Sequence, residues 1–315
     1  MFGNMIVAAK AVAPMFILIG IGMFVRRAGI VTREENRHFN RMVFLVFFST
    51  MMFNNIYNAK LGEVFDGKLI AYTVTAIITM YFASIFAVTR FEKDRRKAGA
   101  TIQAIFRSNY VIMGIPLTAN IFGQESDAVA VATMMAAVIV PLFNMLAVLL
   151  LEAFRGGRVT PLEILKQLMK NPLLMGAVTG LIFNLSGLRL PGMLEDLVAD
   201  MGAVGTPLAL VILGISFDFS QIRKCGRDLV IAIIGRLLIV PGICLTCAAL
   251  LGFRGPAFVA MVAAFATPCA VSSFVMAENM GSDGVLAGNA VILSSLLSCL
   301  TLFGWLFLFR SLGVF

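Results

Sequence analysis

Apolar residues run almost unbroken along this chain in stretches separated by short polar segments. A helix that crosses a bilayer needs about 20 predominantly apolar residues. Ten stretches approach that length, at residues 5–25, 38–58, 68–89, 98–121, 127–153, 171–188, 202–218, 228–251, 256–280 and 285–309. The pattern therefore predicts an all-α integral membrane protein with ten transmembrane helices.

Two of these stretches contain proline and polar residues where a membrane helix should be continuous. The first interruption spans residues 107–116 and holds Arg107, Asn109, Met113 and Pro116. The second spans residues 266–273 and holds Thr267, Pro268, Ser272 and Ser273. Proline removes a helical hydrogen bond, and the freed carbonyl finds no water in lipid. Paired interruptions in the two halves of a membrane protein indicate the substrate site of a secondary transporter.

Composition agrees with a membrane protein. Hydrophobic residues make up 60% of the chain and charged residues 13%, whereas soluble domains have about 45–50% and about 25%. The net charge of +8 is explained by the enrichment of Lys and Arg in cytoplasmic loops. We therefore expect the lipid bilayer, and no nucleic acid, as a partner.

The basic residues predict an orientation. Loops on one side carry 17 Lys and Arg, including the groups 26–41 and 90–97, and loops on the other side carry 5. By the positive-inside rule, both termini are extracytoplasmic.

Comparing the two halves of the chain indicates an internal repeat. At an offset of 158 residues Pro14 matches Pro172, and three glycines match: Gly22 with Gly180, Gly29 with Gly187, and Gly123 with Gly281. We predict a first five-helix repeat at 1–153, a cytoplasmic linker at 154–170 and a second repeat at 171–315. Because five is odd, the second repeat is inverted, which suits alternating access. The prolines of the two interruptions are six residues out of this register.

The polar groups at the interruptions suit a small anion. A broken helix offers N-terminal N–H groups to an anion and C-terminal carbonyls to a cation. Asn144, Asn54 and Asn55 are further amides inside predicted helices. The candidate substrate-binding residues are Asn54, Arg107, Asn109, Met113, Pro116, Asn144, Thr267, Pro268, Ser272 and Ser273.

Each of these features has a structural alternative. Arg107 either faces substrate or extends its side chain to the membrane surface. Arg236, inside another predicted helix, is expected to reach the surface or to pair. The hydroxyls and amides could instead join helices to one another.

Other kinds of chemistry lack the residues they need. No Asp or Glu lies in the middle of a predicted helix, and Glu278 comes nearest. The single histidine, His38, and the five cysteines form no metal-ligand or catalytic arrangement. We expect no cofactor, no metal and no enzymatic activity.

The order of several segments resembles the auxin efflux carrier family, in its bacterial branch, over essentially the whole chain. The segments that carry the likeness are Val12–Arg27, Arg107–Gly123, Asn171–Leu190, Gly205–Gly214, Arg236–Pro241 and Ala266–Gly281.

The resemblance implies a 5+5 inverted repeat with crossed, broken helices 4 and 9, similar in plan to bile-acid sodium symporters and sodium–proton antiporters. It implies transport of auxin-like anions or of dicarboxylates such as malate or malonate across the bacterial inner membrane. The family's crossover prolines correspond to Pro116 and Pro268, and its site asparagines to Asn109 and Asn144. Unlike plant members, the chain has no long loop between helices 5 and 6, so regulation through such a loop is not expected.

Two other functions remain open at this point. One is a sodium- or proton-coupled exchanger or symporter of the same fold, and the other is a membrane sensor that does not transport. Coupling of anion transport to protons or sodium, and assembly as a homodimer, are also left open by the sequence.

Overall fold

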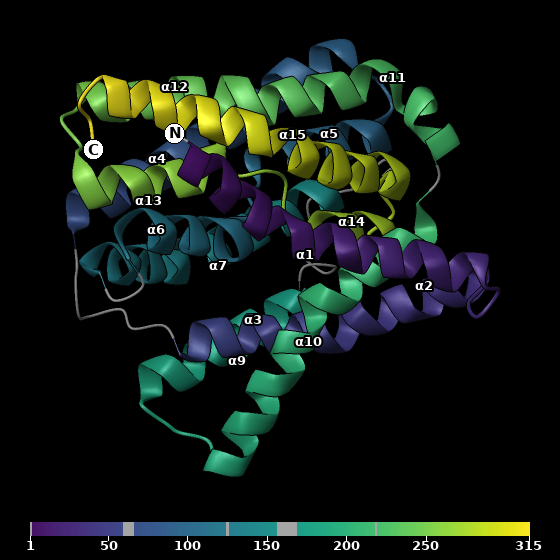
Figure 1. Cartoon of the computed structure of the whole chain (residues 1–315). Helices are drawn as coiled ribbons and strands as arrows, with labels where there is room; N and C mark the ends of the chain where they lie inside the picture. Colours follow the sequence, from purple (N-terminus) through teal and green to yellow (C-terminus); the bar gives the residue numbers. More distant parts are fainter. Residues whose placement is uncertain (1, 59–65, 124–125, 156–168, 218) are drawn as a thin grey trace.

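The computed structural model describes residues 2–58, 66–123, 126–155, 169–217 and 219–315 (Figure 1). Its helices are α1 (Phe2–Arg27), α2 (Arg33–Met42), α3 (Phe48–Tyr57), α4 (Gly67–Phe91), α5 (Arg95–Phe106), α6 (Ile115–Phe122), α7 (Asp127–Ala153), α9 (Pro172–Ser186), α10 (Gly192–Ser216), α11 (Phe219–Ile234), α12 (Val240–Leu250), α13 (Gly255–Ala266), α14 (Ser272–Asn279) and α15 (Gly284–Ser311). The π-helical turns η1 (Val43–Phe47), η2 (Tyr110–Gly114) and η3 (Gly235–Ile239) directly precede α3, α6 and α12. In these ranges the fold is all-helical, as predicted.

Helix occupies most of each predicted apolar stretch. Five segments among the described residues are long and apolar enough to cross a membrane: Gly67–Phe91, Val131–Ala153, Gly192–Ser216, Cys225–Leu250 and Gly284–Ser311. Shorter apolar helices occupy Tyr110–Ala119, Pro172–Ser186 and Gly255–Ala266. The chain is therefore an integral membrane protein.

The second predicted helix begins earlier than the apolar pattern indicated. Thr32 forms a capping box with Glu35, so α2 starts at Arg33 and continues through η1 into α3. In this box the backbone N–H of Glu35 donates to Thr32 Oγ1, and the backbone N–H of Thr32 donates to the Glu35 carboxylate. Reciprocal bonds of this kind satisfy N–H groups that an open helix end leaves without partners.

One group of helices packs through glycines. It comprises α1, α3, α9 and α10, of which α3, α9 and α10 lie in the lower part of Figure 1 and α1 packs against α10. A Cβ on Gly22 would overlap the carbonyl oxygen of Val211, and a Cβ on Gly180 would overlap that of Phe53. Backbones approach this closely only where a helix presents small residues.

A second group contains α13, whose residues 258–266 are all buried. Its members are α4, α5, α6, α7, α11, α12, α14 and α15, and the two interrupted helices belong to it. Figure 1 shows the start of α1 and the C-terminus at the same end of the molecule. At that end Gly255 donates its backbone N–H to the carbonyl of Val314 at 3.0 Å.

Candidate substrate site

The two interruptions lie against each other. Between α5 and η2, and between α13 and α14, the backbone leaves the helical conformation, and Ser108 pairs with Cys269 in an isolated antiparallel bridge. The backbone N–H of Asn109 donates to the carbonyl of Pro268 at 2.8 Å. Two breaks that lie 160 residues apart in the sequence thus satisfy part of each other's backbone hydrogen bonding at this point.

The first break does not lie at its proline. The non-helical residues are 107–109, whereas Pro116 stands in the first turn of α6, after the π-helical turn η2. Proline is tolerated at a helix start because its missing N–H would have no helical partner there. Pro268, by contrast, lies inside the unwound segment before α14. The two prolines therefore occupy different positions relative to the breaks.

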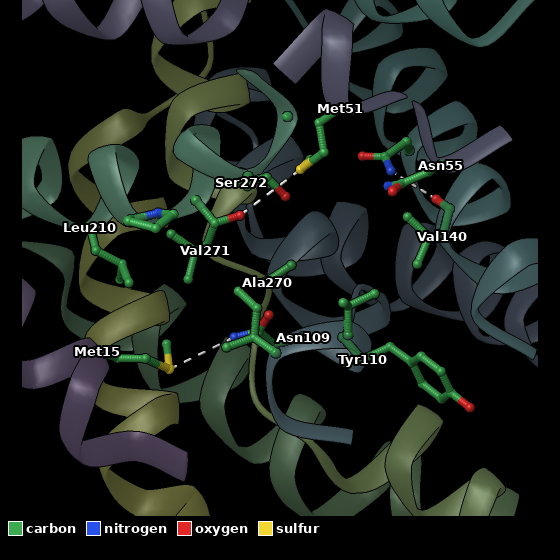
Figure 2. Close-up of a pocket in the computed structure, with 18 of the residues that line it drawn as sticks. Met15, Met51, Asn55, Asn109, Tyr110, Val140, Leu210, Ala270, Val271 and Ser272 are labelled. Carbon is green, nitrogen blue, oxygen red and sulfur yellow. Dashed lines mark hydrogen bonds between the residues drawn. The ribbon is translucent and has the colours of Figure 1, made fainter. Parts of the chain in front are cut away.

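A cavity of about 680 Å³ adjoins the interruptions, between the two helix groups. Figure 2 shows side chains from α1, α3, α7, α10 and both breaks surrounding this space. Its lining is largely apolar and includes Met15, Leu18, Val140, Phe143 and Leu210. The cavity reaches the protein surface on the first half of α10, where Ala199 and Ala203 are exposed.

The candidate residues divide into two sets. Those that line the cavity are Asn54, Arg107, Asn109, Pro116, Asn144 and Ser272. Those that do not, all of them buried, are Met113, Thr267, Pro268 and Ser273. Thr267 donates its hydroxyl to the carbonyl of Ala263 at 2.7 Å, so its polar group serves its own helix.

Several lining residues were not among the candidates. Met15 and Met51 accept long hydrogen bonds of 3.9 Å from Asn109 Nδ2 and Thr206 Oγ1, and Figure 2 shows the first of these contacts. Asn55 lies beside Asn54 on the lining. Among the lining residues of α10, Thr206 is the one whose polar side chain could have indicated the site from the sequence, because it precedes Pro207 inside an apolar stretch.

Arg107 does not extend to the membrane surface. Its side chain is 2% exposed, and its guanidinium donates through Nη2 to Asn144 Oδ1 and through Nη1 to Met276 Sδ at 2.7 Å. Among the described residues no carboxylate lies within ion-pair distance of it. A buried charge without an opposite charge is costly. The site therefore contains a cation whose acceptors are neutral.

Comparison with known proteins finds transport proteins as relatives over nearly the whole chain. A family described as "Membrane transport protein" matches residues 7–306. An uncharacterized transporter of Methanothermobacter thermautotrophicus is 27% identical, over 95% of this chain and 97% of its own length. A putative malonate transporter of Rhizobium meliloti is 24% identical, over 95% of both chains. Auxin efflux carrier component 5 of Arabidopsis thaliana is 23% identical, over 94% of this chain and 95% of its own. The chain thus belongs to the membrane transport protein family, and the resemblance to auxin efflux carriers is confirmed.

Proposed function

We propose that this protein is a secondary transporter that carries a small organic anion by alternating access, with its substrate site at the two paired interruptions. One observation carries the proposal. Arg107 lies buried on the wall of the cavity and has only neutral acceptors among the described residues. A carboxylate that entered the cavity would supply the missing negative charge.

The surroundings of Arg107 suit a carboxylate with an apolar body. A guanidinium binds a carboxylate through two parallel N–H donors, and in Arg107 these now contact Asn144 and Met276, which are weaker acceptors. The amides of Asn54, Asn55 and Asn109 line the same cavity and could hold a second polar group. Malonate-type and auxin-type anions, suggested by the names of the relatives, are the first candidates.

The inverted repeat belongs to this proposal, and the glycine contacts support it. Gly22 packs against Val211, and Gly180 packs against Phe53. An offset of 158 residues relates Gly22 to Gly180 and Phe53 to Val211, so the two contacts are equivalent under the proposed repeat. Gly29 and Gly187 each have a φ of 70°, and Gly123 and Gly281 have φ of 95° and 75°. These matches support repeats at 1–153 and 171–315. Most of the proposed linker, at 156–168, lies outside the described residues.

The cavity's shape suggests which step of the cycle is represented. At the end of α10 away from the opening, Asn36 donates to Ile212 O at 3.1 Å, and Asn279 donates to Asn40 O at 3.4 Å. These contacts close that end between α2, α10 and α14. With both termini extracytoplasmic, as the basic loops suggest, this is an outward-facing state in the inner membrane.

The cation-exchanger alternative has less support. Such proteins need a carboxylate within the membrane, and the described lining residues of the cavity include neither Asp nor Glu. A non-transporting sensor differs from a carrier only in flux, so the experiment must measure both binding and flux.

The test is uptake by purified protein in proteoliposomes, with binding of the same carboxylates measured by thermal shift. Arg107→Gln is expected to lower affinity for the transported anion about tenfold or more, since hydrogen bonds to charged groups contribute about 1.5–3 kcal/mol. Arg27→Gln, at an exposed arginine of α1, is the matched control and should leave affinity unchanged. Saturable binding without flux would show that the protein is a sensor and not a carrier. Unchanged affinity in Arg107→Gln would contradict the proposed position of the site.

A further inference from the structure

Arg236 is a second buried arginine near the interruptions, and it lies outside the substrate cavity. Its side chain is 0% exposed, so it neither reaches the membrane surface nor lines the cavity. Its position in the π-helical turn η3 is held close to the end of α5, because a Cβ on the preceding Gly235 would lie only 2.8 Å from Ile105 Cγ1.

All the hydrogen-bond partners of Arg236 are backbone carbonyls at the ends of two helices. At the end of α5 its Nη1 donates to the carbonyls of Ile105 and Phe106, both at 3.2 Å. At the end of α13 its Nη2 donates to Ala264 at 3.1 Å and to Phe265 at 2.7 Å. Its Nε donates to Thr267, in the second break, at 2.8 Å.

These carbonyls belong to the last turns of the two half-helices that end at the interruptions. The last four carbonyls of a helix have no partner within it, and each helix C-terminus carries about half a negative charge. Two such ends side by side carry about one negative charge, which a guanidinium balances. In transporters with broken helices, carbonyls at such half-helix ends bind Na⁺.

We infer that Arg236 replaces a bound cation at the paired helix ends. It is a positioning residue, because it does not line the substrate cavity and acts by holding the ends of α5 and α13 together. Binding of the anion therefore needs no sodium or other inorganic cation at this point. The inference rests on the proposed transport function only where it concerns anion binding.

The experiment removes the guanidinium group of Arg236 and supplies a cation in solution in its place. Thermal unfolding of purified Arg236→Ala is measured without carboxylate, in millimolar chloride salts of choline, sodium, potassium or guanidinium at constant ionic strength. Arg236→Ala is expected to unfold at a lower temperature and to regain about 2–4 °C, saturably, with guanidinium. The wild-type protein is expected to unfold at the same temperature in all four salts.

Arg26→Ala is the matched control. Arg26 also caps a helix end, by donating through Nη1 to Ile215 O at 3.4 Å and to Phe217 O at 2.8 Å, but it lies at the end of α10, away from the interruptions. This variant is expected to lose stability without gaining any response to guanidinium. The inference is overturned if Arg236→Ala and Arg26→Ala respond alike, or if sodium saturably stabilises the wild-type protein.

Two further variants decide the matter if Arg236→Ala does not fold. Arg236→Lys keeps a positive charge, and Arg236→Met keeps the chain length without it. The Arg236→Lys variant is expected to retain its affinity for the transported carboxylate. The Arg236→Met variant is expected either to bind it about tenfold more weakly or to fail to fold under conditions in which Arg236→Lys folds. Equal affinities in the Arg236→Lys and Arg236→Met variants would overturn the inference. The effect of sodium on the wild-type protein can be measured even if no variant folds. A wild-type protein that bound no carboxylate would remove the proposed function and leave the salt measurements intact.

Discussion

Arg107 at the end of α5 donates a hydrogen bond through Nη2 to Oδ1 of Asn144 in α7. The amide of Asn144 is oriented by its own bond, since its Nδ2 donates to the carbonyl of Val140 at 2.8 Å. Asn144 therefore presents its oxygen to the guanidinium. A neutral oxygen leaves the charge of Arg107 available, whereas a carboxylate in the same place would neutralise it.

Asn144→Asp tests this distinction. The substitution keeps the size of the side chain and places a carboxylate against Arg107, so the substrate would compete with a permanent ion pair. Affinity for the transported carboxylate is expected to fall at least about tenfold, which corresponds to about 1.4 kcal/mol, while the unfolding temperature stays unchanged or rises. Isothermal titration would measure the affinity. Asn144→Ala leaves the charge unpaired and serves as the comparison; equal affinities in Asp and Ala variants would contradict the prediction.

Asn109→Ala separates a side-chain role from a backbone role. The backbone N–H that bonds Pro268 remains in alanine, so the bridge between the interruptions is expected to survive. The lost groups are an amide on the cavity wall and a weak 3.9 Å contact with Met15 Sδ. Transport measured in proteoliposomes is expected to fall at least about tenfold with little loss of stability. Asn109→Pro removes the backbone donor as well and is expected to lower stability too; wild-type transport by Asn109→Ala would show that its amide does not bind substrate.

Helix packing in the first group is tested by glycine substitutions. Gly22→Ala and Gly180→Ala would each force a methyl group against a backbone carbonyl and are expected to lower stability by about 1–3 kcal/mol. Gly20→Ala lies in the same helix as Gly22 and meets no atom within 4 Å, so it should be neutral or stabilising. Thermal unfolding compares the three variants. If Gly22→Ala were tolerated and Gly180→Ala were not, the two contacts would not be equivalent, contrary to the proposed repeat.

The helices were predictable because a membrane leaves the backbone no alternative. Within lipid every N–H and C=O must find a partner inside the segment, so the length of each apolar stretch determines a helix. The early start of α2 was also readable, since Thr32 and Glu35 have the spacing of a capping box. That start lies in polar sequence, where hydropathy gives no signal.

The site was less predictable, for two physical reasons. Hydropathy indicates the depth of a residue in the membrane but not the side of the helix on which it lies, so Thr267 and Ser273 could not be distinguished from Ser272. The partners of Arg236 lie in helix ends far from it in the sequence, and no local pattern indicates them. Pro116 shows a related limit, because a proline fits the first turn of a helix as well as a break.

The capping box at the start of α2 predicts a local effect of pH. The pKa of Glu35 is lowered because its carboxylate accepts hydrogen bonds from the backbone N–H and the hydroxyl of Thr32. A carboxyl whose pKa is lowered by folding stabilises above its unfolded pKa of about 4.3, and this stabilisation is lost as the pH falls through the folded value. Amide exchange at the start of α2, corrected for intrinsic rates, is therefore expected to accelerate below about pH 4. Thr32→Ala should accelerate it at neutral pH, and Glu34→Gln, outside the box, should not; equal effects would contradict the prediction.

Cysteine labelling tests both the orientation and the closed end of the cavity. In a background with the five native cysteines replaced by alanine, Ala203→Cys stands at the exposed rim and is expected to react with a membrane-impermeant maleimide added outside. Bound carboxylate should slow that reaction, because the site lies deeper in the same cavity. Asn40→Cys replaces a side chain that is 2% exposed at the opposite end and is expected to react only from the cytoplasmic side, and faster during transport. Labelling of Ala203→Cys from the cytoplasm would reverse the proposed orientation. Labelling of Asn40→Cys that is equally fast with and without substrate would mean that the contacts of α2 with α14 do not open and close during transport.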